Sequence, residues 1–377
     1  MAMPGWRLPE TMTALPTRKL EAFRYTDLRA LAAISFATNM ATGQAGDLPA
    51  LGIPRLVFLN GRFSAAHSDT IPFTRDFTPV ADDGALPLAQ INAGEAQDGI
   101  TLDISEGVDA GAVLLVSHAA GTGPFAFHPR HRITLGAGAR LVLVEVAQGD
   151  GVYWHNPVTD IVLHEGAKLA HYRLQDESRE AFHLATIRVN IAGLAAYESF
   201  TACLGAKLSR AEFHARLHGA RAHAHINAAQ ILGTTQLGDF TTVINHAAPD
   251  CASRQTVKSV LSGAARGVFQ GRIEVDRVAQ KTDGYQMTQA LLLSPGAEMD
   301  IKPELQIFAD DVKCSHGATI GALDPEQIFY LRSRGIPEAQ AREMLIRAFL
   351  DEALEPVSFA PARELFEAKI AAWWAGT

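Results

Sequence analysis

The sequence predicts a mainly β protein in which a β-solenoid lies between helical N-terminal and C-terminal regions. Between residues 100 and 320, short β-favouring runs alternate with glycine-containing turns. The glycines of these turns, Gly138, Gly166, Gly193 and Gly219, recur at intervals of 28, 27 and 26 residues. Regular intervals of this size are typical of stacked coils, each of which needs its neighbours to bury its apolar face. A large β-sandwich with regularly spaced turns is the alternative fold.

Residues 1–99 are expected to form a separate region of mixed, partly helical structure. Within residues 17–34, apolar side chains recur at spacings of three to five, which predicts a helix. An Asn-Gly dipeptide between two apolar runs predicts a hairpin over residues 55–64. Residues 65–99 show no sustained periodicity and are expected to be linker-like.

The body, residues 100–320, is predicted to be built from β-strands. The clearest β-favouring runs are 140–146, 186–191, 240–245, 271–275 and 290–294. The sequence GAGARL at 136–141 is similar to a dinucleotide-binding loop, but it lacks the third glycine and the following helix. We therefore interpret it as a turn of the solenoid.

Residues 321–377 are predicted to be a helical domain. Asp324, with a proline directly after it and a glutamine three residues on, predicts a capped helix that ends at Gly335. A second helix is expected from Pro337 to about Ala353. Its expected apolar stripe consists of Met344, Leu345, Ala348 and Phe349. A third helix follows Pro361, with one apolar side formed by Phe366, Ile370, Trp373 and Trp374.

The composition excludes several classes of protein. The chain has 377 residues and a formal net charge of −8, which argues against nucleic acid or an anionic membrane surface as a partner. Its apolar runs are far shorter than the roughly 20 residues of a membrane span. Three scattered cysteines are too few for a disulfide framework and suit a reducing compartment. We expect a cytoplasmic protein.

The densest cluster of reactive side chains is ADDVKCSHGATIGALD at 309–324. On an extended strand Cys314 and His316 share a face with Cβ atoms roughly 6.5–7 Å apart, while Lys313 points to the opposite face. That separation does not suit a thiolate–imidazole catalytic pair. As metal ligands the two residues supply only half of a four-coordinate site.

Two other groups of side chains were weighed as sites. A histidine-rich stretch contains His214, His218, His223 and His225. No acid or thiol with ligand spacing accompanies them, so we interpret these histidines as stacked surface residues. Cys203 lies among apolar neighbours and is expected to be buried and structural.

Residues 248–275 and 281–336 resemble the core of the SufB/SufD family of iron–sulfur cluster assembly proteins. The segment LPTRKLEAFRYTDL at 15–28 resembles the opening of the SufD branch, and KCSHGATIG and YQMTQALLLS also favour SufD over SufB. The similarity is specific over about residues 245–355 and weaker upstream to about residue 125. It implies a right-handed parallel β-helix core.

The resemblance also implies a function. The chain would be a non-catalytic scaffold subunit that pairs with a SufB-like scaffold through the β-helix. His316 and Cys314 would lie at that interface and meet iron or an iron–sulfur cluster transiently, with ligands completed by the partner, and no cofactor would stay bound to the chain alone. A SufC-like ABC ATPase would dock on the C-terminal helices that carry Asp324, Phe329, Tyr330, Arg332, Met344 and Phe349. The isolated chain could instead pair with itself.

Two alternatives belong to other classes. One is a stand-alone β-helix hydrolase or lyase acting on carbohydrate, for which the β region offers no repeated aspartate pair on one strand face. The other is the SufB branch, which would carry a cluster itself. If the C-terminal helices serve only to dock the ATPase, truncation after Ala322 should leave the solenoid folded.

Overall fold

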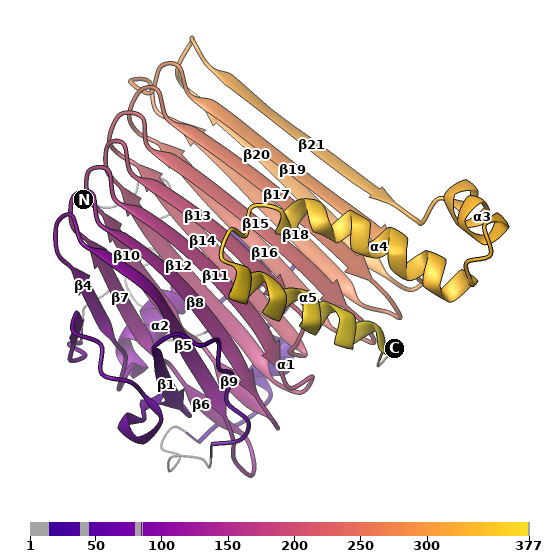
Figure 1. Ribbon diagram of the computed structural model, residues 1–377, viewed down its shortest axis with the longest axis horizontal. Helices are drawn as coiled ribbons and strands as arrows, with labels where there is room; N and C mark the ends of the chain where they lie inside the picture. Colours follow the sequence, from indigo (N-terminus) through magenta and orange to yellow (C-terminus); the bar gives the residue numbers. More distant parts are fainter. Residues whose placement is uncertain (1–14, 38–44, 80–83, 85, 376–377) are drawn as a thin grey trace.

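Two parallel β-sheets face each other along the length of the molecule, and the chain passes from one sheet to the other with each half-coil (Figure 1). This computed structural model describes residues 15–37, 45–79, 84 and 86–375. The predicted fold class, a β-solenoid flanked by helices, is confirmed, and the β-sandwich alternative is wrong. Within the described ranges, no helix has both the length and the apolar character needed to cross a membrane.

The strands fall into a ten-stranded and an eleven-stranded sheet. In spatial order, the ten-stranded sheet contains β2 (Arg62–Phe63), β1 (Arg55–Leu59), β5 (Asp109–Ala119), β8 (Arg140–Gly149), β11 (Lys168–Glu177), β13 (Ala196–Cys203), β15 (His223–Leu232), β17 (Ala252–Leu261), β19 (Asp283–Leu292) and β21 (Lys313–Gly321). The eleven-stranded sheet contains β20 (Glu298–Ile307), β18 (Arg266–Val275), β16 (Leu237–His246), β14 (Leu208–Leu217), β12 (Phe182–Ile191), β10 (Val158–Leu163), β7 (Arg130–Leu135), β4 (Thr101–Ile104) and β3 (Thr74–Arg75), with β6 (Phe125–Phe127) and β9 (Tyr153–His155) beside β12.

The coil repeat is visible in the strand register. Arg140, Lys168, Ala196 and His223 are Cα partners on successive strands of the ten-stranded sheet, which gives coils of 28, 28 and 27 residues. The glycine spacing therefore measured the coil length correctly.

The glycines do not all occupy the same place in the turn, however. Gly138 and Gly166 have φ values of +67° and +68°, and the equivalent left-handed positions of the next two coils belong to Leu194 and Arg221, both at +60°. Each of these residues donates its backbone N–H to the turn of the following coil, for example Gly138 to Glu165 O at 2.8 Å and Leu194 to Ala220 O at 3.0 Å. Gly193 and Gly219 lie one or two residues earlier in their turns.

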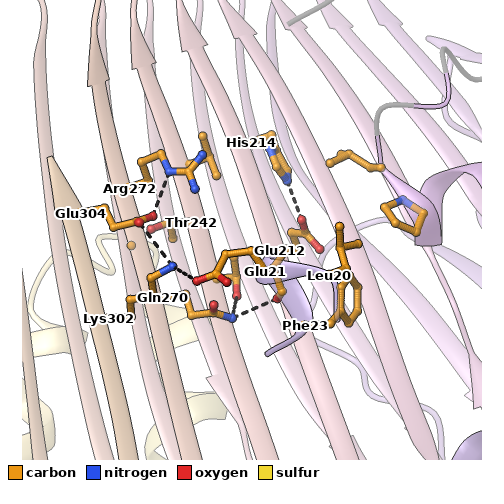
Figure 2. Close-up of a pocket in the computed structure, with 16 residues that line it drawn as sticks. Leu20, Glu21, Phe23, Glu212, His214, Thr242, Gln270, Arg272, Lys302 and Glu304 are labelled. Atoms are coloured by element: carbon orange, nitrogen blue, oxygen red, sulfur yellow. Dashed lines mark hydrogen bonds and ion pairs between the residues drawn. The ribbon is translucent and has the colours of Figure 1, made fainter. Parts of the chain in front are cut away.

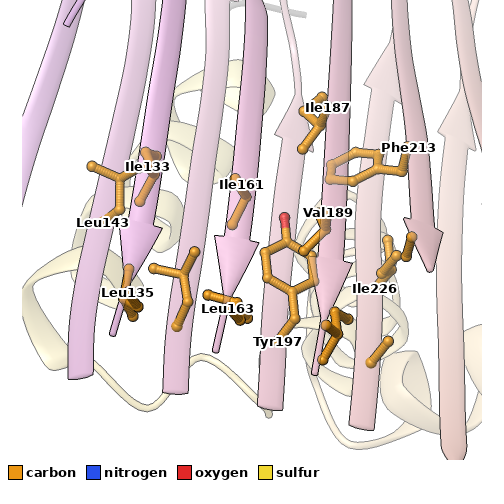
Figure 3. Close-up of a cluster of buried hydrophobic side chains, with 14 of the residues drawn as sticks. Ile133, Leu135, Leu143, Ile161, Leu163, Ile187, Val189, Tyr197, Phe213 and Ile226 are labelled. Carbon is orange, nitrogen blue, oxygen red and sulfur yellow. The ribbon is translucent and has the colours of Figure 1, made fainter. Parts of the chain in front are cut away.

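The core lies between the two sheets. Figure 3 shows side chains from both sheets pointing into this space. Ile133, Leu143, Ile161, Ile187 and Phe213 each have 1% or less of their surface exposed. Alternate residues of each strand point inward, so every coil adds to one continuous apolar column, and each fully buried large side chain contributes about 1.5–3 kcal/mol.

The predicted N-terminal helix over 17–34 is wrong. The segment instead forms a 3₁₀ turn, η1 (Glu21–Phe23), and one short helix, α1 (Arg29–Ala32). Its apolar side chains are buried against the outer face of the eleven-stranded sheet, in a cluster with Phe182, Leu184 and Leu208. Contact with the sheet therefore overrides the helical spacing.

The rest of the N-terminal region is partly as predicted. The Asn60-Gly61 turn has φ values of +49° and +75°, and β1 and β2 pair antiparallel across it, which confirms the hairpin. Residues 65–99 are not a simple linker, because they contain η2 (Ala65–His67), β3 and the helix α2 (Pro87–Glu95).

Three C-terminal helices are present as predicted: α3 (Pro325–Ser333), α4 (Glu338–Leu354) and α5 (Ala360–Ala375). Figure 1 shows α4 and α5 lying across the strands, whereas α3 lies beyond the strand ends. The predicted stripe of α4 is shifted, since Met344 is 45% exposed. The buried residues of α4 are Ala341, Ile346, Leu350, Ala353 and Leu354.

Candidate functional site

The predicted pair Cys314 and His316 lies on β21, the last strand of the ten-stranded sheet. Cys314 is opposite the buried Gly284 and His316 is opposite the buried Gln286, so both side chains belong to the inward-facing row of β19 and β21. His316 is exposed and Cys314 is partly buried. Burial raises the pKa of the Cys314 thiol, so the thiol is the favoured form at neutral pH.

The pair alone is an incomplete metal site. Among the described residues, no third histidine, cysteine or carboxylate completes a three-ligand set with Cys314 and His316. Imidazole and thiolate are nevertheless the ligands that suit iron and zinc. The chemistry available here is therefore that of a half-site at an open surface.

This surface is the end of the solenoid. Among the described residues, β20 and β21 pair with other strands on one side only, so each of these long strands leaves one edge of backbone N–H and C=O groups free for another strand. Exposed apolar side chains line the same end: Ile307 is 39% exposed, Phe308 64% and Ile320 49%. The other end of the stack finishes instead in β2 and β3, which have two residues each and run antiparallel to their neighbours.

The space inside the last coils is polar rather than apolar. Both amide atoms of Gln286 and the hydroxyl of Thr288 are buried without a hydrogen-bond partner. In the preceding coil, the Thr242 hydroxyl donates to Gln255 Oε1 at 2.6 Å. The apolar column of the earlier coils therefore gives way to amides and hydroxyls directly behind His316.

The predicted ATPase-docking residues lie on α3 and α4. The Asp324 carboxylate caps α3 by accepting from Glu326 N at 2.8 Å, as its sequence position predicted. Phe329 and Tyr330 are 74% and 58% exposed. Arg332 lines a groove of about 360 Å³ between α3, α4 and the end of β19. Phe349 is turned toward the sheet, where its ring lies 4.7 Å from Lys258 Nζ.

The histidine-rich stretch does not form a patch. His214 lies on β14 and His225 on β15, which belong to different sheets. Each has a carboxylate partner that the sequence reasoning missed: His214 Nε2 is 2.8 Å from Glu212 Oε1, and His225 Nδ1 is 3.1 Å from Glu198 Oε2. Cys203 is buried as predicted, and burial raises the pKa of its thiol to about 12.

A cavity of about 60 Å³ lies where the N-terminal segment covers the outer face of the eleven-stranded sheet (Figure 2). Lys302 Nζ is 2.6 Å from Glu21 and 3.3 Å from Glu304, and Arg272 Nε donates to Glu304 at 3.0 Å. Gln270 donates to Ala22 O at 3.1 Å. Because these charged groups pair with one another, we interpret the cavity as a seam that fixes the N-terminal segment.

One buried cluster was not predicted. His155 on β9 and His183 on β12 are register partners, and both face Glu177 at the end of β11. The side chains of these three residues are no more than 4% exposed. The signal in the sequence was available, since the two histidines are 28 residues apart, which is one coil.

Comparison with known proteins identifies the family. The family model described as "SUF system FeS cluster assembly, SufBD core domain" matches residues 116–349. The chain is 35% identical over 361 residues to the iron-sulfur cluster assembly protein SufD of Escherichia coli (strain K12), a match that covers 91% of this chain and 85% of that protein.

Two further relatives agree with this assignment. An iron-sulfur cluster assembly SufBD family protein of Synechocystis sp. is 31% identical over 92% of this chain and 84% of its own length. The chloroplastic protein ABCI7 of Arabidopsis thaliana is 37% identical over 63% of this chain and 50% of its own. The chain belongs to the SufBD family of iron–sulfur cluster assembly proteins, and within it the chain is SufD-like.

Proposed function

We propose that this chain is the SufD-type scaffold subunit of an iron–sulfur cluster assembly complex, and that it pairs with a SufB-like scaffold through β20 and β21. The observation that carries the proposal is the open end of the solenoid. Two long strands there expose free edges and apolar side chains, and His316 stands among them. Strand addition at such edges supplies main-chain hydrogen bonds, while apolar side chains supply burial.

The incomplete ligand set supports the same proposal. His316 and Cys314 would hold iron or a nascent iron–sulfur cluster only transiently and only when the partner contributes further ligands. The chain itself would then act as a non-catalytic scaffold. A complex of this kind suits the reducing cytoplasm, where Cys203, Cys251 and Cys314 stay free thiols.

A SufC-like ABC ATPase would dock on the C-terminal helices. The support is that α3 buries none of its residues and presents Phe329 and Tyr330 to solvent. Exposed aromatic side chains beside a groove are typical of binding surfaces. Asp324 would start the docking helix, and Arg332 and Met344 would flank the aromatic pair.

The pairing surface is tested by co-purification with a SufB-like scaffold and a SufC-like ATPase. Ile320→Lys places a charge at the free edge and should abolish co-purification of the scaffold, because a buried unpaired charge is costly. Val108→Lys is the matched control, since Val108 is 42% exposed in the β4–β5 turn near the other end of the stack. Undiminished pairing of the Ile320→Lys chain would contradict the proposal, as would a parent chain that pairs only with itself.

The ligand role is tested in the assembled complex. His316→Ala should reduce the iron and sulfide held by the complex at least tenfold while the melting temperature of the isolated chain stays unchanged, because His316 is exposed. Cys314→Ala should give a smaller loss. His164→Ala, at another exposed histidine, is the control. A His316→Ala chain that fails to fold would show instead that His316 is structural. Anaerobic reconstitution of the chain alone should leave no stable cluster.

A further inference from the structure

The cluster of His155, Glu177 and His183 is separate from the open end of the solenoid. It lies within the early coils, where β9, β11 and β12 meet. His155 Nδ1 is 3.0 Å from Glu177 Oε1, and His183 Nδ1 is 2.7 Å from Glu177 Oε2. In a tetrahedral site with ligand bonds of about 2.0–2.1 Å, neighbouring donor atoms are about 3.3 Å apart. The three side chains thus already have nearly the spacing of ligands to one ion.

The Glu177 carboxylate has no fixed positive partner. Within the described part of the chain it contacts the two histidines and Gln175, whose Nε2 donates to Oε2 at 3.0 Å, and no lysine or arginine. A buried carboxylate normally needs a positive charge close to it. A divalent cation between the carboxylate and two neutral imidazoles would supply that charge.

The histidines are not satisfied by hydrogen bonds alone. His183 Nδ1 is close to Glu177 Oε2 but off the line of a hydrogen bond, and it is buried without another partner. Neighbouring groups fix the positions of the donors. The Phe127 ring stacks on the His155 ring with centroids 4.5 Å apart, and Gln175, which holds the carboxylate, accepts from Gly205 N at 3.2 Å. Such outer contacts orient metal ligands in known sites.

We propose that His155, Glu177 and His183 bind one divalent transition-metal ion, zinc or ferrous iron, inside the solenoid. Two imidazole nitrogens and one carboxylate oxygen favour these ions over calcium or magnesium, which take oxygen ligands. The ion would tie the eleven-stranded sheet to the end of β11. Because the ligands are no more than 4% exposed, it would enter as the chain folds.

The test uses the full chain alone, so its outcome does not depend on the proposed pairing. Cys314→Ala/His316→Ala is the parent chain, which removes the ligands at the open end from the measurement. The protein is unfolded in urea, refolded anaerobically with one equivalent of Zn²⁺ or of Fe²⁺, and desalted, and its metal is then counted by mass spectrometry. About one equivalent per chain is expected for the ion that the site prefers.

The decisive variant is Glu177→Gln in the parent chain. Glutamine has the size of glutamate and keeps hydrogen bonds to neutral imidazoles, so the variant should fold, with an unchanged circular dichroism spectrum, and retain less than a tenth of the metal. Glu198→Gln, which alters the exposed pair with His225, should retain all of it. Refolding with Co²⁺ should give visible bands from tetrahedral nitrogen and oxygen ligation that disappear in His183→Gln.

Two results would overturn the proposal. One is a parent chain that retains neither ion after refolding. The other is a Glu177→Gln chain that retains as much metal as the parent. The preferred ion follows from which refolding reaches one equivalent.

Discussion

Arg210 is fully buried beneath the N-terminal segment, and its charge is balanced by carboxylates from two neighbouring strands. It forms ion pairs with Asp239 and with Glu212, the latter at 3.1 Å, and Thr26 of the N-terminal segment donates to the same Asp239. The guanidinium lies 4.4 Å from the Phe23 ring. Burial would raise the pKa of Glu212, but Arg210 and His214 outweigh it and lower the pKa to about 2. Because a buried ion pair is costly to break, this group fixes the segment in place.

His246 gives a pH-dependent prediction at the scale of one residue. It is fully buried beside Ser253, with Nε2 2.9 Å from the hydroxyl, and burial lowers its pKa from 6.5 to about 4. The unfolded chain therefore binds a proton at pH values where the folded chain does not. Stability is fully present above pH 6.5 and falls as the pH drops from 6.5 toward 4, by about 3 kcal/mol for this group.

The comparison variant is His246→Gln, which keeps a hydrogen-bonding group but does not titrate. Urea unfolding at pH 7 and pH 4.5 should show a smaller loss of stability in this variant than in the parent. His164→Gln, at an exposed histidine, should leave the loss unchanged. Equal losses in the parent and His246→Gln chains would show that His246 does not resist protonation in the fold.

At the scale of elements, sequence patterns predicted those parts of the fold that depend on local chemistry. Alternation, turn glycines and the Asp324 cap gave strands, coil length and the start of α3. The segment 17–34 was predicted wrongly because its apolar spacing is set by the sheet it covers. Residues 65–99 were predicted wrongly because α2 has only a weak apolar face.

The same distinction applies to the sites. Strand alternation alone was enough to place Cys314 and His316 on one face. The cluster of His155, Glu177 and His183 required a coil register good to one residue, and glycine positions could not supply it because the left-handed residue of the turn moves to Leu194 and Arg221. Side chains that meet across the two sheets are therefore hidden from a pattern that follows one strand.

The turn glycines give a prediction at the element scale. A Cβ atom at Gly219 would lie 2.0 Å from Gly193 N, which is backbone and cannot turn aside, so Gly219→Ala should force two coils apart. At Gly138 a Cβ atom meets nothing within 4 Å, and only the positive φ is unfavourable, at about 1 kcal/mol. Thermal unfolding should therefore show a much larger drop in melting temperature for Gly219→Ala than for Gly138→Ala. Equal drops would mean that the coils can separate at this turn without cost.

At the scale of the whole molecule, α4 and α5 are part of the folded core. Ile346, Leu350 and Phe366 are buried against side chains of the ten-stranded sheet such as Phe200 and Val260. Truncation after Ala322 would uncover this apolar surface. The expectation that the solenoid survives truncation unchanged is therefore revised.

We now expect the truncated chain to lose stability and to aggregate, whereas Phe329→Ala/Tyr330→Ala should not change the melting temperature, because both rings are mostly exposed. Size-exclusion chromatography and thermal unfolding measure the difference. If ATPase docking uses α3, the double variant alone should weaken binding at least tenfold. A truncated chain as stable as the full one would show that the two helices contribute little to the core.

The unequal ends of the solenoid also limit how many chains can join. A stack with two open ends could add copies head to tail without limit and grow into a filament. Here one end finishes in β2 and β3, each two residues long and antiparallel, and the other exposes ten residues of β20 and nine of β21. Once a second chain of the same design covers the long edges, only blunt ends face outward. The fold thus counts to two and stops.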